Sequence, residues 1–565
     1  MTAATPERFH VVLIKPSHYD DGGYVIQWVK AWVPSNSLAC LYGLARHAAD
    51  NRVLGDGVDI VVDAYDETNT VIPLRAIIKR LQRERGIVCM VGVQSNQFPR
   101  TMDMARSLRA AGVDVAIGGF HVSGCLAMLP AVPPEIQEAL DLGITIFAGE
   151  AEGHFDQFLR AAYRRELEPL YSYMNELPQL EGQQLPWLPP AVARRYTPVP
   201  GTFDAGRGCP FLCSFCTIIN VQGRTSRHRT ADDIERLLRS NLAHGIRHYF
   251  ITDDNFARNR NWELIFDRIS ELSAELGVRF KFTIQVDTLC HRIPNFIEKA
   301  HKAGVSRVFI GLETISEENL KSAQKRQNKV AEYREMLLAW KKRKITTYCG
   351  YILGFPGDTP ESILRDIEVV KRELPLEILE FFCLTPLPGS ADHKALHASG
   401  GALDPDLNKY DLEHVCTTHS TMSADEWSAV YDKAWDTYYS MDHLESLMRR
   451  AAAVGRNPRR IFEVALQFYG CYRYFKVHPL QGGFFRRKIR TQRRPTMPLE
   501  HPLIFYPKRI VEFVTMYGGF AAYAARVFRL FLRVRSETRQ ASEPWMDDSI
   551  RDLFTLPEKL GDTTP

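Results

Sequence analysis

Two stretches of the chain alternate between short apolar runs and longer segments with helical periodicity, and this alternation restricts the fold more than any other feature. Strands that alternate with helices form parallel sheets with helices on both faces, and ligands bind at the carboxyl ends of such strands. The first stretch therefore predicts an α/β, doubly wound, Rossmann-like domain. Its five apolar runs are FHVVLIKP, DIVVDAYD, GIVCMVGVQS, DVAIGGFH and ITIFAGEAEG.

Small and polar residues follow several of these runs, where a ligand site is expected. They are Ser17, Ser95, Gly118, Gly119, His121 and Glu150, the last within GEAEG at residues 149–153. Paired glycines after a strand allow the backbone to approach a bulky ligand closely. A tight turn from strand to helix explains the glycines equally well, so both interpretations stay open on these residues alone.

The second stretch repeats the alternation with longer spacing. Its five apolar runs are HYFITDDNF, RFKFTIQVD, SRVFIGLET, TTYCGYILGFPGD and LEFFCLTPLPGS. With one more strand before residue 208, they give six strand–helix units, which predict a partial (β/α)6 barrel of the TIM type with its chemistry at the carboxyl ends of the strands. Polar residues gather at those ends, namely Asp253, Asp254, Asn255, Gln285, Asp287, Glu313 and the segment 354–358.

Three of the 11 cysteines lie within eight positions, in GCPFLCSFC. The other eight cysteines are scattered singly and no apolar signal core follows the start of the sequence, so we expect reduced thiols in a cytoplasmic protein rather than disulfides. A zinc site with His228 as its fourth ligand is one alternative. A four-iron cluster is another, and because it normally takes four thiolates, three cysteines would leave one iron open to a substrate.

The spacing C-x3-C-x2-C, with Phe215 directly before the last cysteine, resembles the motif of the radical S-adenosylmethionine (radical SAM) enzymes. This resemblance implies that Cys209, Cys213 and Cys216 hold a [4Fe-4S] cluster and form the catalytic centre. It also implies that SAM chelates the open iron and is cleaved to methionine and a 5′-deoxyadenosyl radical. An external reductant such as flavodoxin or ferredoxin would supply the electron.

Later segments resemble the same family strand by strand, in ITDDNF, FIGLETISEENL, LGFPGDTPES and CLTPLPGS. The resemblance covers residues 10–390 and implies that SAM contacts Phe215, Asp253, Asp254, Asn255, Gln285, Glu313, Gly354, Phe355 and Pro356. Structural alternatives exist for two of these residues. Asp254 can cap a helix, and Glu313 can form a salt bridge with Arg307.

The N-terminal stretch resembles the cobalamin-binding domain that precedes the barrel in one radical SAM subclass, on the segments VGVQSNQFPRT, AIGGFHVSG and AGEAEG. The resemblance implies that Ser17, Ser95, Gly118, Gly119, His121 and Glu150 bind cobalamin and that the enzyme methylates an unactivated centre. The loop PSHYDDGGY lacks the D-x-H-x-x-G pattern that supplies a histidine ligand to cobalt, which puts the lower ligand in question. Oxidative cyclisation or rearrangement without methyl transfer is the alternative reaction.

Composition and periodicity divide the chain into a Rossmann-like domain over residues 1–160, a proline-rich linker over 161–200, the barrel over 201–395 and a mainly helical domain over 396–565. The net charge of +4 conceals an excess of about 16 positive charges between residues 446 and 540. This charge supports an alternative to the enzyme, in which the chain is a non-catalytic metal-cluster protein that binds an anionic surface.

The aromatic, arginine-edged segment 510–535 has two interpretations. A basic amphipathic helix of this kind can lie in a membrane interface, which would place the protein at the inner face of the membrane and favour a lipid-like substrate over other small molecules. Alternatively, the segment packs against the barrel while its arginines stay in solvent. No nucleic-acid-binding module is recognised, so no nucleic acid partner is expected.

Overall fold

The computed structural model describes residues 6–198 and 200–555, and the chain divides into two compact units. The first unit comprises Met1–Lys281, Thr385–Thr417 and Leu480–Arg509, and the second comprises Phe282–Leu384, Thr418–Pro479 and Ile510–Pro565. The domain boundaries at residues 160, 200 and 395 stay predictions.

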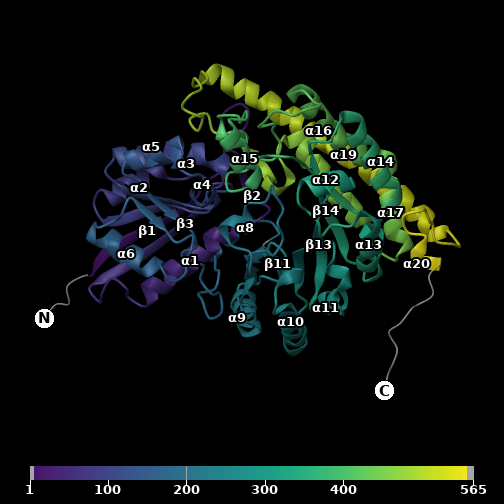
Figure 1. Cartoon of the computed structure of the whole chain (residues 1–565), viewed down its shortest axis with the longest axis horizontal. Coiled ribbons are helices and arrows are strands. Elements are labelled where there is room, and N and C mark those ends of the chain that lie inside the picture. The colour runs from purple at the N-terminus through teal and green to yellow at the C-terminus, as the bar shows by residue number, and fades with distance from the viewer. Residues whose placement is uncertain (1–5, 199, 556–565) are drawn as a thin grey trace. The chain divides into compact units, whose positions relative to one another are not determined.

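A six-stranded parallel sheet forms the centre of the first unit (Figure 1). Its order is β3-β1-β4-β5-β6-β7, so the chain reverses direction across the sheet after β3 and passes to the other side of β1. The strands are β1 Glu7–Lys15, β3 Val58–Asp66, β4 Arg85–Met90, β5 Asp114–Gly118, β6 Thr145–Ala148 and β7 Leu170–Ser172. A ligand crevice is expected at this switch point between β1 and β4, at the carboxyl edge.

Helices cover both faces of this sheet because alternate residues of each strand point to opposite faces. In β1, Val12 and Ile14 belong to one buried apolar cluster, whereas Phe9, Val11 and Leu13 belong to another. The first cluster contains residues of α2 Leu74–Leu81, α3 Phe98–Ala110, α4 Phe120–Met128 and α5 Pro134–Asp141. The second contains residues of α1 Asn36–Asp50 and α6 Phe155–Arg164. The predicted doubly wound, Rossmann-like domain is confirmed.

All five apolar runs of the N-terminal stretch form strands of this sheet. The sixth strand, β7, lies in the proline-rich segment that the sequence predicts to be a linker, and it pairs in parallel with β6 through residues 170–172. Three residues between polar neighbours give no alternation to detect, so only the pairing itself identifies this strand.

The first unit also contains two strands of the barrel stretch, β8 Pro200–Phe203 and β11 His248–Ile251, which pair in parallel. Between them lies a short antiparallel pair, β9 Gly206–Arg207 with β10 Arg227–His228. The helices that follow are α9 Ala231–Leu242 and α10 Trp262–Leu276. A further antiparallel pair joins β2 Gln27–Ala31 to β16 Gly483–Arg487.

The second unit contains four parallel strands in sequence order, with helices between them. The strands are β12 Lys281–Val286, β13 Val305–Glu313, β14 Thr346–Leu353 and β15 Ile378–Cys383, and the main intervening helices are α11 Phe296–Ala303, α13 Tyr333–Lys342 and α14 Pro360–Glu373. With β8 and β11, the chain thus supplies the six parallel strands of the partial (β/α)6 barrel, as predicted.

The C-terminal region is mainly helical, as predicted. Its longer helices are α16 Ala424–Tyr438, α17 Met441–Ala453, α18 Arg459–Ala465, which continues as a π-helix over Leu466–Phe475, and α19 Pro502–Gln540. Within the second unit, Tyr431 and Tyr439 of the α16 segment donate hydrogen bonds to the carbonyls of Phe381 and Leu379 in β15. The aromatic face of α16 therefore anchors the C-terminal helices to the last barrel strand.

Candidate functional site

The three clustered cysteines lie on one loop that is closed at its base by the β9–β10 pair. The loop begins at Gly208, whose φ of +90° is in the left-handed region, and a Cβ there would lie 2.6 Å from the carbonyl oxygen of Thr225. Inside the loop, the Cys216 amide donates to the Cys213 carbonyl at 3.1 Å. The glycine is therefore required for the turn that brings the cysteines together.

The surroundings of the three thiols suit a bound cation. All three cysteines are free of disulfides. Burial raises the pKa of Cys216 to about 12 and also raises that of Cys209, and the carboxylate of Asp254 adds to both shifts. Thiols held protonated in this way become ligands only when a metal replaces their protons. Three such donors on one loop fit an iron–sulfur cluster with one open iron.

The residues that follow β11 divide into two roles. Asp253 is buried and ties strands together, because its carboxylate accepts hydrogen bonds from the Ala205 amide at 2.6 Å and from the Asn259 amide group at 3.0 Å. Asp254 and Asn255 instead act on the cysteines, since the charge of Asp254 raises the pKa of two thiols and Asn255 hydrogen-bonds to Cys209. Burial raises the pKa of each of the two aspartates to about 7.

Glu313 lies at the end of β13 in the second unit, with a φ of +66° that is rare outside glycine. Strained backbone of this kind is often found at functional sites. Its carboxylate accepts a hydrogen bond from Lys325 rather than from Arg307, the partner considered from the sequence. No sequence pattern indicates Lys325 as the partner, because it lies 12 residues away in an irregular segment.

The glycine-rich segment after β14 is held by Asp358. Its carboxylate accepts hydrogen bonds from the amides of Gly354 at 2.9 Å and Phe355 at 3.0 Å, and from the Asn319 side chain at 2.6 Å. This arrangement fixes the backbone of residues 354–356, the segment predicted to contact SAM. Gln285 lies in β12 of the same unit.

A cavity with an empty volume of about 970 Å³ opens at the carboxyl edge of the Rossmann-like sheet. Three strand ends line it, at residues 90–92, 118–120 and 149–152, together with the start of α1. Gly119 has a φ of +146°, and a Cβ there would lie 2.1 Å from the Val93 amide nitrogen. Glycine is therefore required there by the close approach of the Val93 backbone, which agrees with the tight-turn interpretation, although Gly119 also lines the cavity.

The residues predicted to bind cobalamin fall into two groups. Gly118, Gly119 and Glu150 line the cavity. Ser17, Ser95 and His121 are buried away from its lining: the Ser17 hydroxyl donates to the Ile26 carbonyl at 2.6 Å, and the Ser95 hydroxyl lies 3.1 Å from His121 Nδ1.

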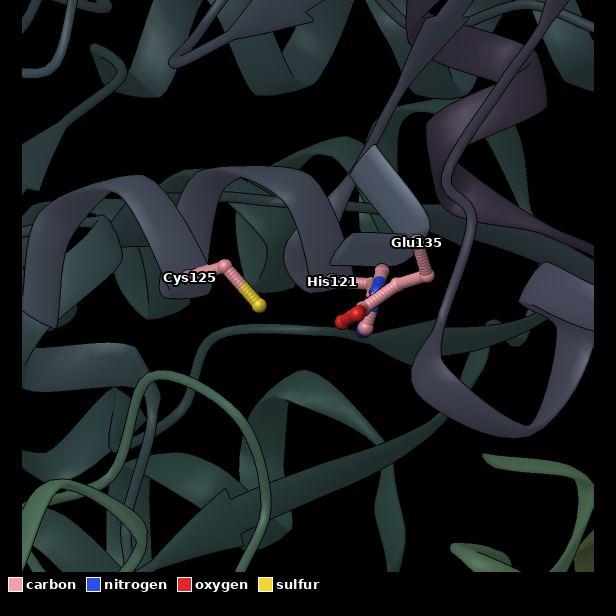
Figure 2. Close-up of side chains that lie close together, drawn as sticks. All are labelled: His121, Cys125 and Glu135. Atoms are coloured by element: carbon pink, nitrogen blue, oxygen red, sulfur yellow. The ribbon is translucent and has the colours of Figure 1, made fainter. Parts of the chain in front are cut away.

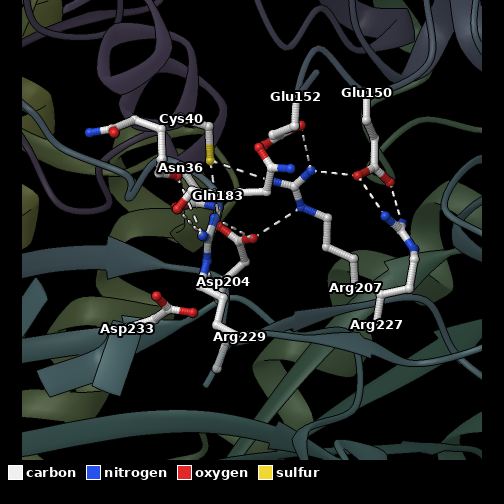
Figure 3. Close-up of polar contacts among 12 residues, drawn as sticks. Asn36, Cys40, Glu150, Glu152, Gln183, Asp204, Arg207, Arg227, Arg229 and Asp233 are labelled. Atoms are coloured by element: carbon white, nitrogen blue, oxygen red, sulfur yellow. Dashed lines mark hydrogen bonds and ion pairs between the residues drawn. The ribbon is translucent and has the colours of Figure 1, made fainter. Parts of the chain in front are cut away.

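An arginine–carboxylate network connects carboxylates of the cavity lining to arginines of β9 and β10 (Figure 3). Its members are Glu150, Glu152, Asp204, Arg207, Arg227 and Arg229, all less than 10% exposed. Arg207 is at its centre and donates to Glu150 at 2.6 Å, to Glu152 at 2.7 Å and to Asp204 at 3.0 Å. With three arginines and three carboxylates, the network is neutral in total, which allows it to be buried.

This network joins two parts of the site. Arg207 and Arg227 belong to β9 and β10, the strands that close the cysteine loop, and both bind Glu150 from the cavity lining. Arg229 is fully buried against Asp204, just before the start of α9. The only sign of this network in the sequence is the pair of glutamates in GEAEG and the pair of arginines in SRHR. Which glutamate binds which arginine depends on the fold.

Comparison with known proteins identifies a radical SAM region within the chain. Residues 205–370 match the model described as "Radical SAM superfamily". The bacteriochlorophyllide d C-8(2)-methyltransferase of Chlorobaculum tepidum is 25% identical over 58% of this chain and 72% of its own. The hopanoid C-2 methylase of Rhodopseudomonas palustris is 29% identical over 33% of this chain and 37% of its own.

Two groups of solved structures share the fold. The radical SAM methyltransferase TsrM from Kitasatospora setae, with cobalamin and a [4Fe-4S] cluster bound, superposes with a TM-score of 0.56 at 14% identity and covers 81% of this chain and 98% of its own. The cobalamin-dependent radical enzyme OxsB superposes with a TM-score of 0.55 at 13% identity and covers 94% of this chain and 83% of its own.

Proposed function

The chain belongs to the radical SAM superfamily and has an N-terminal cobalamin-binding-like domain, and on this premise we propose that it methylates an unactivated centre in a SAM- and cobalamin-dependent reaction. The cysteine loop is the predicted place of the [4Fe-4S] cluster. The names of curated relatives, which include two bacteriochlorophyllide methyltransferases and a hopanoid methylase, support methyl transfer over the other radical reactions.

One observation carries this proposal: the arginine–carboxylate network holds the cysteine loop and the cavity lining in one framework. Arg207 lies two residues before the first clustered cysteine, and its carboxylate partners Glu150 and Glu152 line the cavity. A reaction that needs two cofactors requires their sites to be held at a fixed separation. The buried ion pairs provide this rigidity within the first unit.

When bound, the cluster and SAM supply a 5′-deoxyadenosyl radical, and cobalamin supplies a transferable methyl group. The protein's task is to bind, orient and exclude water. The three cysteines would hold the cluster, with Asp254 and Asn255 beside them. The bare backbone at Gly118, Gly119 and Gly149 would admit cobalamin.

The test is to reconstitute the full-length protein anaerobically with iron, sulfide and hydroxocobalamin, and to supply SAM with a flavodoxin system as reductant. We expect 5′-deoxyadenosine to form, and its formation to fall to background in Cys213→Ala. The control variant Cys349→Ala removes another buried thiol, from β14, and should retain activity. A reconstituted cluster that leaves SAM intact would instead favour the non-catalytic alternative.

Methylation is separated from cyclisation or rearrangement by product mass. With SAM that carries a deuterated methyl group, turnover of pigment and lipid extracts should yield a product that contains the deuterated methyl. A new product without the label would favour the alternative reaction, which uses the same cofactors.

We further propose that the start of α19 contacts an anionic membrane surface and that the substrate is lipid-like. Apolar side chains are exposed there, with Leu503 at 79%, Ile510 at 64% and Val514 at 63%. The same segment carries Lys508 and Arg509 against Glu512. Apolar residues combined with positive charge are typical of helices that lie in a membrane interface. No helix in the described part of the chain is long and apolar enough to cross a membrane.

The later part of α19 agrees with the other interpretation of this segment, in which the helix packs against the protein. Its buried residues recur at helical spacing and so form one packed face of the helix. They are Met516, Tyr523, Val527, Leu530, Phe531 and Val534. The proposed membrane contact is therefore limited to residues 503–514.

Sedimentation with vesicles tests the membrane contact. We expect the full-length protein to bind vesicles that contain phosphatidylglycerol at low salt, and to bind at least about tenfold less after Ile510→Glu with Val514→Glu, because charged side chains oppose insertion. Leu264→Glu changes an equally exposed apolar residue on α10 and should leave binding unchanged. Protein that remains in the supernatant with anionic vesicles would contradict the proposal.

A further inference from the structure

Three potential metal ligands meet in the first unit, outside the cysteine loop and the cavity lining. His121 and Cys125 lie four residues apart on α4, so their side chains share one face of the helix, and Glu135 reaches them from α5 (Figure 2). One nitrogen of His121, the sulfur of Cys125 and one oxygen of Glu135 all lie within 4.8 Å of one another. This cluster is independent of the proposed function.

His121 is arranged as metal-binding histidines usually are. Its side chain is fully buried, and Nδ1 lies 3.1 Å from the Ser95 hydroxyl. The other nitrogen, Nε2, makes no hydrogen bond within the described residues and lies 3.5 Å from Glu135 Oε1. Ligating histidines commonly hold one nitrogen in a hydrogen bond and direct the other at the metal.

The charges of the cluster also suit a divalent ion. Cys125 is 1% exposed, and burial raises the pKa of its thiol well above the usual value. One thiolate, one carboxylate and one neutral imidazole balance the charge of Zn²⁺, so the occupied site would have no net charge to bury.

A second buried imidazole lies near the three ligands. His393, at the start of α15 Ala391–Ser399, has a pKa lowered to about 4 by burial and by the nearby His397 and His121. Its Nδ1 is also buried without a hydrogen-bond partner in the described chain.

We propose that His121, Cys125 and Glu135 form a zinc site, with water in the fourth position. Nitrogen, sulfur and oxygen ligands in this combination are typical of zinc. Metal–ligand bonds of about 2.0–2.3 Å place ligand atoms ~3.5 Å apart, so the cluster would close by about 1 Å. Glu135 is 31% exposed in its side chain, which provides an entry path for the ion.

A bound ion would stabilise one wall of the cavity. The helix α4 begins directly after Gly119, which borders the cavity, and α5 follows a proline-containing connection at residues 129–133. Zinc would link the two helices across this connection.

The experiment uses the full-length chain with Cys209, Cys213 and Cys216 replaced by alanine, so that the cluster thiols bind no metal. After removal of metals by a chelator and dialysis against Zn²⁺, elemental analysis should give about one zinc per chain. X-ray absorption at the zinc edge should show one sulfur at about 2.3 Å and nitrogen or oxygen at about 2.0–2.1 Å. Less than one zinc for every several chains, or a zinc without sulfur, would overturn the proposal.

Paired variants in the same background locate the ion. Cys125→Ala and Glu135→Gln should weaken zinc binding at least about tenfold. Loss of a residue that only hydrogen-bonds to a metal ligand already lowers metal affinity by about that factor, and loss of the ligand itself should lower it at least as much. Cys349→Ala and Glu138→Gln, which remove an equally buried thiol and a neighbouring carboxylate on α5, should bind zinc as the parent does. Equal affinity in both sets would refute the assignment. The X-ray absorption measurement of the zinc–sulfur bond uses the parent protein only. The proposal can therefore be tested even if one of these variants misfolds.

Discussion

Replacing Arg207 by methionine is expected to destabilise the protein by about 3–5 kcal/mol, because it removes one partner from a buried group of charges. Methionine keeps an unbranched apolar stem but is shorter than arginine and supplies no hydrogen bond. Glu150 would retain Arg227 and Asp204 would retain Arg229, whereas Glu152 would lose the arginine that binds both its oxygens. The measurement is chemical denaturation of the full-length protein at pH 7.

The loss should depend on pH in a defined direction. Burial raises the pKa of Glu152, but the charge and hydrogen bonds of Arg207 outweigh it and hold that pKa below its usual value. In the parent, this pairing therefore adds stability above the unfolded pKa of Glu152, and that stability is lost as the pH falls through the folded pKa. In Arg207→Met, the buried carboxylate of Glu152 has no partner and destabilises the folded state. Protonation of Glu152 at lower pH removes this destabilisation. The difference between the two proteins should shrink from pH 7 toward pH 4.5.

Two further variants separate this effect from a general loss of charge. Arg236→Met removes a 64% exposed arginine that pairs with Asp233, and it should cost less than about 1 kcal/mol. Adding Glu152→Gln to Arg207→Met should recover part of the loss, because an amide is less costly to bury than an unpaired carboxylate. A loss of under 1 kcal/mol for Arg207→Met, or one that is constant with pH, would contradict the assigned role.

The strands of the fold were predictable because their signal is local. Each of the five N-terminal runs is an apolar stretch bounded by turn residues, and all five form strands. The strand β7 was missed because three residues at a sheet edge carry no periodic pattern. The cysteine loop could also be predicted from the sequence, because the spacing of its three cysteines is a local feature.

Long-range pairing was not accessible from the sequence. Glu150 was predicted to bind a cofactor, and it does line the cavity, but it also binds Arg207 and Arg227, which are more than 50 residues away. Similarly, His121 was predicted on the cobalamin side, whereas its ring faces Cys125 and Glu135. A side chain on a helix can point to either of two environments, and only the packed structure distinguishes them.

The substitution Gly354→Ala should be as damaging in the second unit as Arg207→Met is in the first. Gly354 has a φ of +101°, which costs a residue with a Cβ about 1–3 kcal/mol. The added methyl group would also lie 1.8 Å from Cζ2 of Trp427, whose indole is 1% exposed and donates a hydrogen bond to the Leu353 carbonyl at 3.2 Å. Overpacking adds about 1–3 kcal/mol.

The same substitution should weaken SAM binding, because Gly354 begins the segment predicted to contact SAM. Displacing Trp427 would shift the backbone that Asp358 holds through the amides of Gly354 and Phe355. We expect a loss of at least about tenfold in SAM affinity by equilibrium dialysis, equivalent to 1.4 kcal/mol. Gly357→Ala is the matched control, since a Cβ there meets only Asn319 Oδ1 at 3.1 Å and needs no left-handed backbone. If both alanine variants bind SAM and unfold alike, the packing of Trp427 on Gly354 does not shape this segment.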